Sequence, residues 1–147
     1  MAETQKTTFA LGCFWHPDEY FSKLPGVVRT RVGYAGGEMP DPTYENVCGG
    51  GTGHSEAVEI EFDPEKISYK ELLEHFFNQH DPAEKQKTQY ASVIFTHSDE
   101  QRAGAEESKR AQQEKSRKPV LTDIRSVEPF HEAEDYHQKY YEKLRKR

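Results

Sequence analysis

The chain has 147 residues, of which 33% are hydrophobic and 31% are charged, and its formal net charge is -6. This length predicts a single domain over residues 1–147, with one core to which the 8 Tyr and 8 Phe contribute much of the volume. The acidic balance argues against nucleic acid or an anionic membrane as the main partner, and no apolar run is long enough to span a bilayer.

The first half of the chain predicts strands and helices in alternation. His16-Pro17 indicates a helix start, because proline suits the first helical turn and the carboxylates that follow suit the N-terminal end. The segment HSEAVEIEF alternates apolar and polar residues, so Val58, Ile60 and Phe62 should share one covered face. The expected elements are a strand at 6–12, a helix from 16 to about 24, a strand at 27–34, a loop at 35–53 and a strand at 54–62.

The second half continues the alternation. Ser68 with Glu71 forms a capping-box pattern that opens an amphipathic helix, and Ser98 with Gln101 opens a highly charged helix that should lie on the surface. Further elements are expected as strands at 90–96 and 120–127 and a last helix at 133–146. The order predicts an α+β fold in two layers, with a split βαβ (ferredoxin-like) core, a mixed sheet and additional C-terminal elements.

Cys13 lies between an apolar run and the first turn of the first predicted helix, beside Phe14 and the only tryptophan, Trp15. A helix N-terminus stabilises a thiolate, which favours a nucleophile at this place. The acidic Asp18 and Glu19 oppose thiolate formation, and a lone cysteine can also be a small buried hydrophobe. Position alone leaves both interpretations open.

Glu56 is the first candidate partner of this thiol. Its parity along the strand turns its carboxyl group toward the covered face, where burial raises a pKa and keeps a proton near neutrality. The alternative is that Glu56, at the edge of its strand, reaches solvent or pairs with a cation. Parity also places Tyr34 with Val28 and Val32, and Tyr90 could point inward, although most tyrosines are core residues.

The cysteines and the Gly-rich segment limit the other kinds of site. Cys13 and Cys48 form no CxxC pair and have no cluster of histidines nearby, so neither a disulfide framework nor a zinc site is predicted. We therefore expect a reducing, cytoplasmic location. The segment GGGTGH lacks the phosphate-binding lysine and leads into a strand, which indicates a flexible loop instead of a nucleotide site.

Six segments carry a family resemblance: GCFW, GVVRTRVGYAGG, PTYENVCGGGTGHSEAVEIEFDP, SYKELLEHFFNQHDP, TQY and AEDYHQKYY. In this order they closely resemble the peptide methionine sulfoxide reductase A family over nearly the whole chain. The resemblance implies protein repair by reduction of methionine S-sulfoxide, free or in proteins, through a cysteine sulfenic acid. It implies no metal or organic cofactor, and an external thiol reductant such as thioredoxin.

The resemblance also implies roles for individual residues. They are Cys13 as the nucleophile, Glu56 as the acid, Tyr34 and Tyr90 as hydroxyls around the sulfoxide oxygen, and Phe14 and Trp15 as the wall for the substrate's methyl group. His54, Asp135 and His137 are expected to support them. Donors aimed at the sulfoxide oxygen would help a thiolate to attack the positive sulfur.

The sequence departs from the family pattern at three places. His16 stands where glycine is usual, and the segment 83–87 is short and lacks the aspartate that the family has in its hydrogen-bond network. No cysteine lies near the C-terminus, so Cys48 is the internal candidate for a resolving thiol that forms a disulfide with Cys13. The alternative is direct attack on the sulfenic acid by an outside thiol.

Two other functions fit parts of the sequence. The short segment could have removed catalysis and left a binding module for oxidised methionine. A Cys-His hydrolase would need His54 or His137 to act as a base for Cys13, and no motif marks such a pair. Only a reductase consumes two thiol equivalents per substrate converted. No apolar stripe for a partner subunit is evident, so a monomer is expected.

Overall fold

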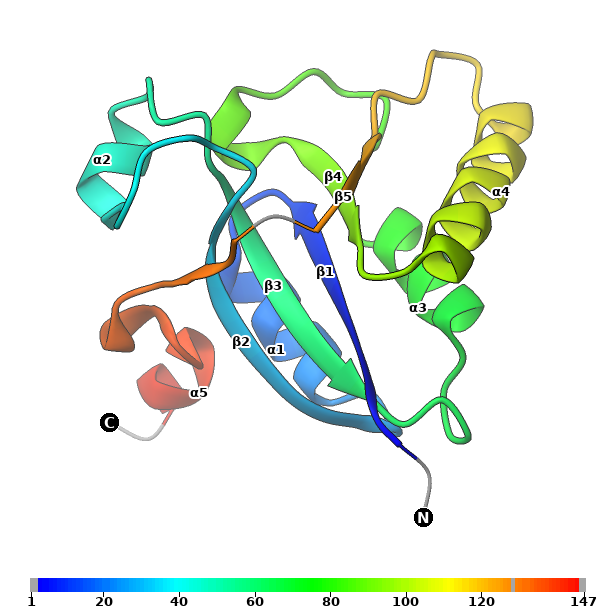
Figure 1. Ribbon diagram of the computed structural model, residues 1–147, viewed down its shortest axis with the longest axis horizontal. Coiled ribbons are helices and arrows are strands. Elements are labelled where there is room, and N and C mark those ends of the chain that lie inside the picture. The colour runs from blue at the N-terminus through cyan, green and yellow to red at the C-terminus, as the bar shows by residue number, and fades with distance from the viewer. Residues whose placement is uncertain (1–2, 128, 146–147) are drawn as a thin grey trace.

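The computed structural model describes residues 3–127 and 129–145 (Figure 1). The strands are β1 (Gln5–Leu11), β2 (Val27–Ala35), β3 (Ser55–Phe62), β4 (Ser92–Thr96), β5 (Asp123–Ser126) and β6 (His131–Glu132). The helices are α1 (Trp15–Ser22), α2 (Tyr44–Cys48), α3 (Tyr69–Asn78), α4 (Asp99–Lys115) and α5 (Tyr140–Arg145), with 3-10 helices η1 (Thr88–Tyr90) and η2 (Asp135–His137).

The strands form one mixed sheet in the order β5-β4-β1-β3-β2-β6. The pair β4 and β5 is parallel, whereas β1 and β2 each run antiparallel to their neighbours. Strand β3 therefore separates the two strands that α1 connects, and β1 separates the two that α3 connects. This arrangement confirms the predicted split βαβ core, to which β5, β6 and α5 are added.

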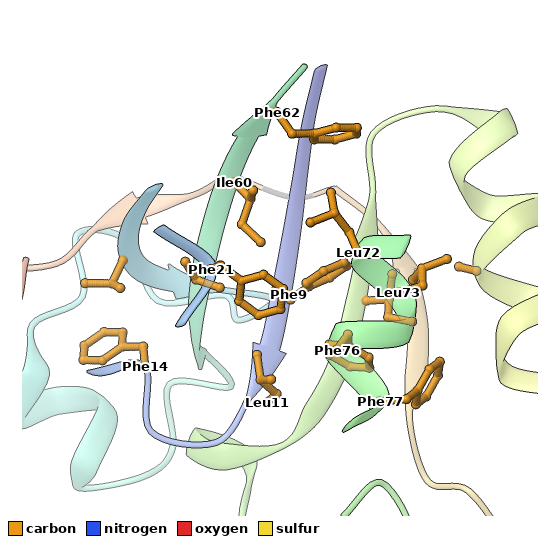
Figure 2. Packing of buried hydrophobic residues seen from close by; sticks show 14 of the residues in the cluster. Phe9, Leu11, Phe14, Phe21, Ile60, Phe62, Leu72, Leu73, Phe76 and Phe77 are labelled. Carbon is orange, nitrogen blue, oxygen red and sulfur yellow. The ribbon is translucent and has the colours of Figure 1, made fainter. Parts of the chain in front are cut away.

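The core lies between the sheet and helices α1 and α3 (Figure 2). Val58, Ile60 and Phe62 are fully buried, as their alternation predicted. The ring of Phe9 in β1 lies 4.9 Å from that of Phe76 in α3. Each such buried side chain contributes about 1.5–3 kcal/mol to folding, so the few apolar residues of this chain are concentrated here.

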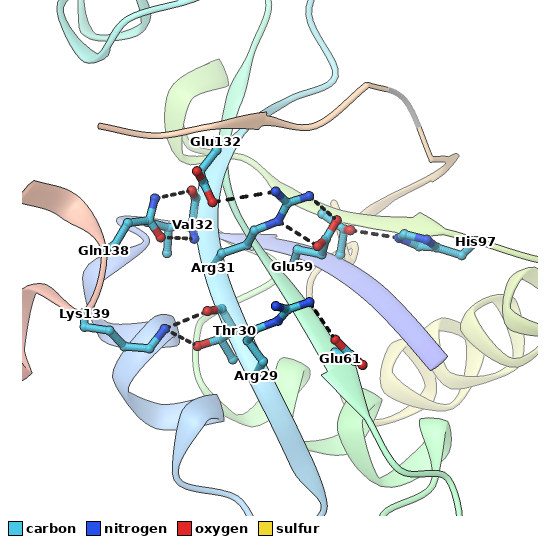
Figure 3. Close-up of polar contacts among 11 residues, drawn as sticks. Arg29, Thr30, Arg31, Val32, Glu59, Glu61, His97, Glu132, Gln138 and Lys139 are labelled. Atoms are coloured by element: carbon cyan, nitrogen blue, oxygen red, sulfur yellow. Dashed lines mark hydrogen bonds and ion pairs between the residues drawn. The ribbon is translucent and has the colours of Figure 1, made fainter. Parts of the chain in front are cut away.

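The other face of the same strands carries charged pairs (Figure 3). Arg29 donates to Glu61 at 3.0 Å, and Arg31 donates to Glu59 at 2.8 Å, between residues that are register partners in β2 and β3. The carboxylates of Glu59 and Glu61 therefore face away from the core, as the period of two predicted.

The segment that follows β6 forms side-chain hydrogen bonds with β2 (Figure 3). The Gln138 amide bonds both the N–H and the C=O of Val32, each at 2.9 Å. The Lys139 ammonium donates to the hydroxyl and carbonyl oxygens of Thr30 at 2.7 Å and to the fully buried Asp18 carboxylate at 2.9 Å. These contacts of Gln138 and Lys139 hold residues 134–137 beside the N-terminal end of α1.

The last predicted helix, 133–146, is wrong over its first half. Residues 135–137 form η2, and Lys139 has a φ of 53°, so an α-helix begins only at Tyr140. The reason is that Gln138 and Lys139 form hydrogen bonds with β2 and α1 that a continuous helix would not allow.

Two further differences concern β2 and the loop after it. A register shift between Val27 and Arg29 leaves Val28 58% exposed, so Val28 does not share the covered face of Val32. The predicted loop contains α2, which Thr43 caps by accepting from the N–H of Asn46. This helix carries residues to the site that the sequence interpretation left in a loop.

Candidate active site

Cys13 sits in the turn between β1 and α1. The strand ends at Leu11, and Gly12 has a φ of 103°, a backbone conformation that glycine adopts without steric cost. Phe14 is the N-cap residue and Trp15 is the first residue of the helix. Cys13 is therefore exposed directly before a helix N-terminus, as predicted.

The electrostatic surroundings raise the pKa of the Cys13 thiol. Partial burial of the thiol is the main cause, and the charges of Glu56 and Cys48 act in the same direction. A hydrogen bond with the backbone of Trp15 lowers this pKa but does not outweigh the burial. The expected stabilisation by the helix start is present, but the thiol is the dominant form at rest and the nucleophilic thiolate is the minor one.

Glu56 is 1% exposed, so its carboxyl group faces the covered side as its parity predicted. One carboxyl oxygen accepts from the Phe14 N–H at 3.2 Å, and the other lies 2.6 Å from Nε2 of Gln89. Burial raises the pKa of Glu56, although these two hydrogen bonds and the charge of Lys87 act against the rise. A buried carboxyl group with a raised pKa suits a proton donor.

Gln89 is a site residue that the sequence interpretation missed. It belongs to η1 and is 4% exposed. Its Nε2 also lies 3.1 Å from the Cys48 sulfur, and its Oε1 is buried without a hydrogen-bond partner among the described residues. Its place beside Tyr90 in the segment TQY was the only signal available.

The structure corrects the role expected of Tyr34. The ring is fully buried 5.8 Å from that of Phe14, and the hydroxyl group donates to a carboxylate oxygen of Glu134 at 2.7 Å. Burial followed by this bond raises the pKa of Tyr34 far above its usual value. In this structure the Tyr34 hydroxyl proton is directed to Glu134, so Tyr34 supports the site through that carboxylate.

Tyr44 is a second tyrosine near the thiols, which the sequence interpretation missed. It begins α2, and its hydroxyl group is hydrogen-bonded to the Cys48 thiol one turn later, which is the main cause of its raised pKa. The hydroxyl groups of Tyr44 and Tyr90 are also hydrogen-bonded, and Tyr90 lines a pocket with Cys13. Tyr90 thus lies beside the pocket that Cys13 lines, in η1 and not in a strand as predicted.

Glu134 replaces Asp135 as the supporting carboxylate, which is a second correction. Its second oxygen accepts from the Tyr44 N–H at 3.0 Å, so it joins β2 to the start of α2. The Asp135 side chain is fully exposed and pairs with Lys143 at 3.7 Å, on the surface. Adjacent side chains of a 3-10 helix point in different directions, so only one of these carboxylates can face the site.

Trp15 is held in a defined orientation by the C-terminal segment. Its indole N–H donates to Nδ1 of His137 at 2.9 Å, and its ring stacks on Tyr140 with 3.8 Å between centroids and 7° between planes. The buried Phe14 ring lies 5.2 Å from the His137 ring. The two aromatic residues before and at the start of α1 are thus fixed by residues far away in sequence.

We expect Tyr140→Ala to release the Trp15 ring. Because Trp15 is the only tryptophan, its fluorescence emission should move to longer wavelength, and the KM for a methionine sulfoxide peptide should rise about 2- to 10-fold. Tyr140→Phe keeps the stacked ring and should behave as the wild type. Tyr141→Ala is the matched control. An unchanged emission spectrum in Tyr140→Ala would show that Tyr140 does not hold the Trp15 ring in place.

The ring nitrogens of His54 and the Nδ1 of His137 are bonded to groups other than Cys13. His54 accepts from the Gly37 N–H and donates to the Met39 carbonyl, which fixes the Gly-rich loop. His137 accepts the Trp15 N–H, and burial lowers its pKa, so it is a neutral ring partner. Both act as supporting residues, and their positions give no support to the hydrolase alternative.

A pocket of about 320 Å³ opens beside Cys13. The short segment 83–87 supplies part of its wall through Glu84 and Gln86, and Tyr90 also lines it. His16, the other departure from the family pattern, is bonded to Gln79 at 3.0 Å and does not line this pocket. The thiol therefore faces a hollow that is open to a substrate.

Within the described ranges, 3–127 and 129–145, no group of three or more His, Cys, Asp or Glu could hold a metal ion. In the same part of the chain no helix is long and apolar enough to cross a membrane.

Comparisons with known proteins point to one family. A family model described as peptide methionine sulfoxide reductase matches residues 5–147. The peptide methionine sulfoxide reductase MsrA of Methanosarcina mazei is 53% identical over 148 residues, which cover 95% of this chain and 70% of that protein. The reduced form of Mxr1 from Saccharomyces cerevisiae matches with a TM-score of 0.91 and 33% identity, covering 99% of this chain and 88% of Mxr1.

A second structure of Mxr1, in complex with Trx2, matches with a TM-score of 0.70 and 26% identity. It covers 94% of this chain and 85% of that one.

Proposed function

The chain belongs to the peptide methionine sulfoxide reductase family, and from this premise we propose that it reduces methionine S-sulfoxide, free or within proteins, to methionine. The observation that carries the proposal is the junction of nucleophile and acid. The Phe14 N–H, directly after Cys13, donates to the buried Glu56 carboxyl group at 3.2 Å, which ties the acid to the residue next to the nucleophile.

The residues divide the chemistry between them. The Cys13 thiolate attacks the sulfoxide sulfur while Glu56 gives its proton to the oxygen, so methionine leaves and Cys13 becomes a sulfenic acid. The hydroxyl groups of Tyr44 and Tyr90 are the donors nearest to this oxygen in the proposal, in place of Tyr34. Phe14 and Trp15 form the apolar wall for the substrate's methyl group.

The first test is reduction of the separate S- and R-epimers of a methionine sulfoxide peptide with dithiothreitol. We expect the S-epimer alone to be converted, with two thiol equivalents consumed for each methionine formed. Binding of the S-epimer peptide without conversion would replace the reductase with a binding module. Conversion without thiol consumption would contradict both.

We propose further that Cys48 resolves the sulfenic acid. The S–S bond to Cys13 forms as the S–O bond breaks, and the oxygen leaves as water. Three observations support this role: both thiols are free and exposed, the charge of Cys48 acts on Cys13, and Gly50 and Gly51 follow α2 with positive φ. The glycines allow the loop to carry Cys48 toward its partner.

Replacing Cys48 by Ser should separate the two halves of the cycle. With thioredoxin and its reductase we expect steady turnover to fall by about tenfold or more, because an outside thiol must then attack the sulfenic acid directly. A single equivalent of methionine should still form without any reductant. Wild-type turnover rates in Cys48→Ser with thioredoxin would show that Cys48 is only a loop residue.

The reductant and the location follow from the same chemistry. The Mxr1 structure in complex with Trx2 supports a thioredoxin-like dithiol protein as the partner of this chain. Two unpaired thiols at the surface suit a reducing compartment, so we propose that the protein acts in the cytoplasm.

A further inference from the structure

The Gln89 side chain touches both the acid and the second thiol. Its Nε2 lies 2.6 Å from the Glu56 carboxyl group and 3.1 Å from the Cys48 sulfur. An N–H···O bond is ordinarily about 2.7–3.2 Å long, whereas 2.6 Å lies within the range of O–H···O bonds. The separation therefore fits a protonated Glu56 that donates to an amide oxygen at least as well as an ionised Glu56 that accepts from the N–H group.

Nothing among the described residues fixes which way this amide points. The Oε1 atom is buried without a partner, so a rotation by 180° exchanges the oxygen and nitrogen and breaks no third hydrogen bond. In one orientation the NH2 group donates one hydrogen to the Glu56 carboxylate and the other to the Cys48 sulfur. In the other, the carbonyl oxygen accepts from the protonated Glu56 and from the Cys48 thiol.

We propose that the Gln89 amide is a rotating relay that couples the proton of Glu56 to the state of the Cys48 thiol. While Glu56 holds its proton, the carbonyl oxygen faces both groups and keeps Cys48 as a thiol. After Glu56 has lost its proton, the NH2 group faces both and stabilises the Cys48 thiolate, which is also hydrogen-bonded to the Tyr44 hydroxyl group. Gln89 is thus a positioning residue.

The relay rests on the proposed function, and it sets the order of two steps: Cys13 is oxidised first and Cys48 is activated second. Glu56 loses its proton when the sulfoxide oxygen is protonated, which is the moment at which Cys13 becomes a sulfenic acid. A thiolate at Cys48 is needed only then, because the thiolate and not the thiol attacks, and the proton that Cys48 gives up leaves with the sulfenic oxygen as water. The amide rotation would therefore activate the second thiol after the first step and not before it.

The sign of one measurement separates the relay from a direct electrostatic effect. In a Cys13→Ser background Cys48 is the only thiol, and its pKa can be read from the pH dependence of alkylation by iodoacetamide. Glu56→Gln imitates the protonated acid, because the Phe14 N–H holds the carbonyl side and leaves the NH2 group for Gln89. The relay predicts that Glu56→Gln raises the pKa of Cys48 by about one unit.

A direct field predicts the opposite sign, because removing a negative charge lowers the pKa of a nearby thiol. In a Gln89→Met background, which has no relay, we expect Glu56→Gln to lower the pKa of Cys48 or leave it unchanged. The comparison uses four proteins: Cys13→Ser alone, with Glu56→Gln, with Gln89→Met, and with both changes. The other titratable groups around Glu56 and Cys48 are the same in all four: Lys87, Tyr34, Tyr44, Tyr90 and Tyr136.

The same shift of the Cys48 pKa with and without Gln89, or a fall of that pKa while Gln89 is present, would overturn the relay. Gln89→Leu gives the same comparison if Gln89→Met does not fold, as judged by circular dichroism. The measurement needs no sulfoxide, so its failure is distinct from a failure of the proposed reductase activity.

Discussion

We expect Cys13→Ser to lose reduction of methionine S-sulfoxide by about four orders of magnitude or more. A serine hydroxyl group ionises far less readily than a thiol, and it cannot form the sulfenic acid through which the oxygen leaves. The measurement is methionine formation from the S-epimer with excess dithiothreitol, followed by chromatography. This reductant can regenerate Cys13 without help from another residue, so the assay isolates the first step.

Cys48→Ser is the matched control for this experiment, because it also removes one exposed thiol. With dithiothreitol it should keep forming methionine, and without reductant its Cys13 should react with dimedone, a trap for sulfenic acids, after one turnover. Loss of activity in both variants would point to a shared folding defect. Activity that persists in Cys13→Ser would exclude Cys13 as the nucleophile.

The alternation of residues along β3 was the basis for the correct placement of Glu56. A period of two is a property of the strand itself, so Glu56 and Glu59 could be placed on opposite faces of the strand without any tertiary information. Cys13 was equally local, since a strand end followed by His16-Pro17 fixes a thiol before a helix. These positions depend on a few neighbouring residues.

The tyrosines could not be assigned from local sequence patterns alone. Tyr34 obeys its parity and is buried, but whether its hydroxyl group meets a substrate depends on Glu134, about 100 positions later. Tyr44 reaches the site only because α2 forms inside a Gly- and Pro-rich stretch. The capping pattern of Thr43 with Asn46 was the one available sign of that helix.

The C-terminal segment was the least predictable part of the site. Its sequence suits a helix from residue 133, yet the contacts of Gln138 and Lys139 with β2 and α1 interrupt it. Tertiary hydrogen bonds outweighed helix propensity here. The consequence was to select Glu134 instead of Asp135 as the carboxylate at the site.

Glu56→Gln should lower the rate of the first methionine-forming turnover by about 10²- to 10⁴-fold. The amide keeps the size of the side chain and its bond to the Phe14 N–H but has no proton acidic enough to donate. Rapid quenching of a single turnover measures this step directly. Glu59→Gln is the matched control, because Glu59 lies on the same strand with its carboxylate on the opposite face, paired with Arg31.

The pH profile gives the same assignment a second test. The active form needs both the Glu56 proton and the Cys13 thiolate, and the structure raises both pKa values above their usual levels. The wild-type rate should therefore rise with pH up to the pKa of Glu56, stay level between the two pKa values, and fall above that of Cys13. In Glu56→Gln only the thiolate limits the slow residual rate, so this rate should rise through the pKa of Cys13 and not fall. An alkaline fall of equal size in both proteins would show that the proton comes from another group.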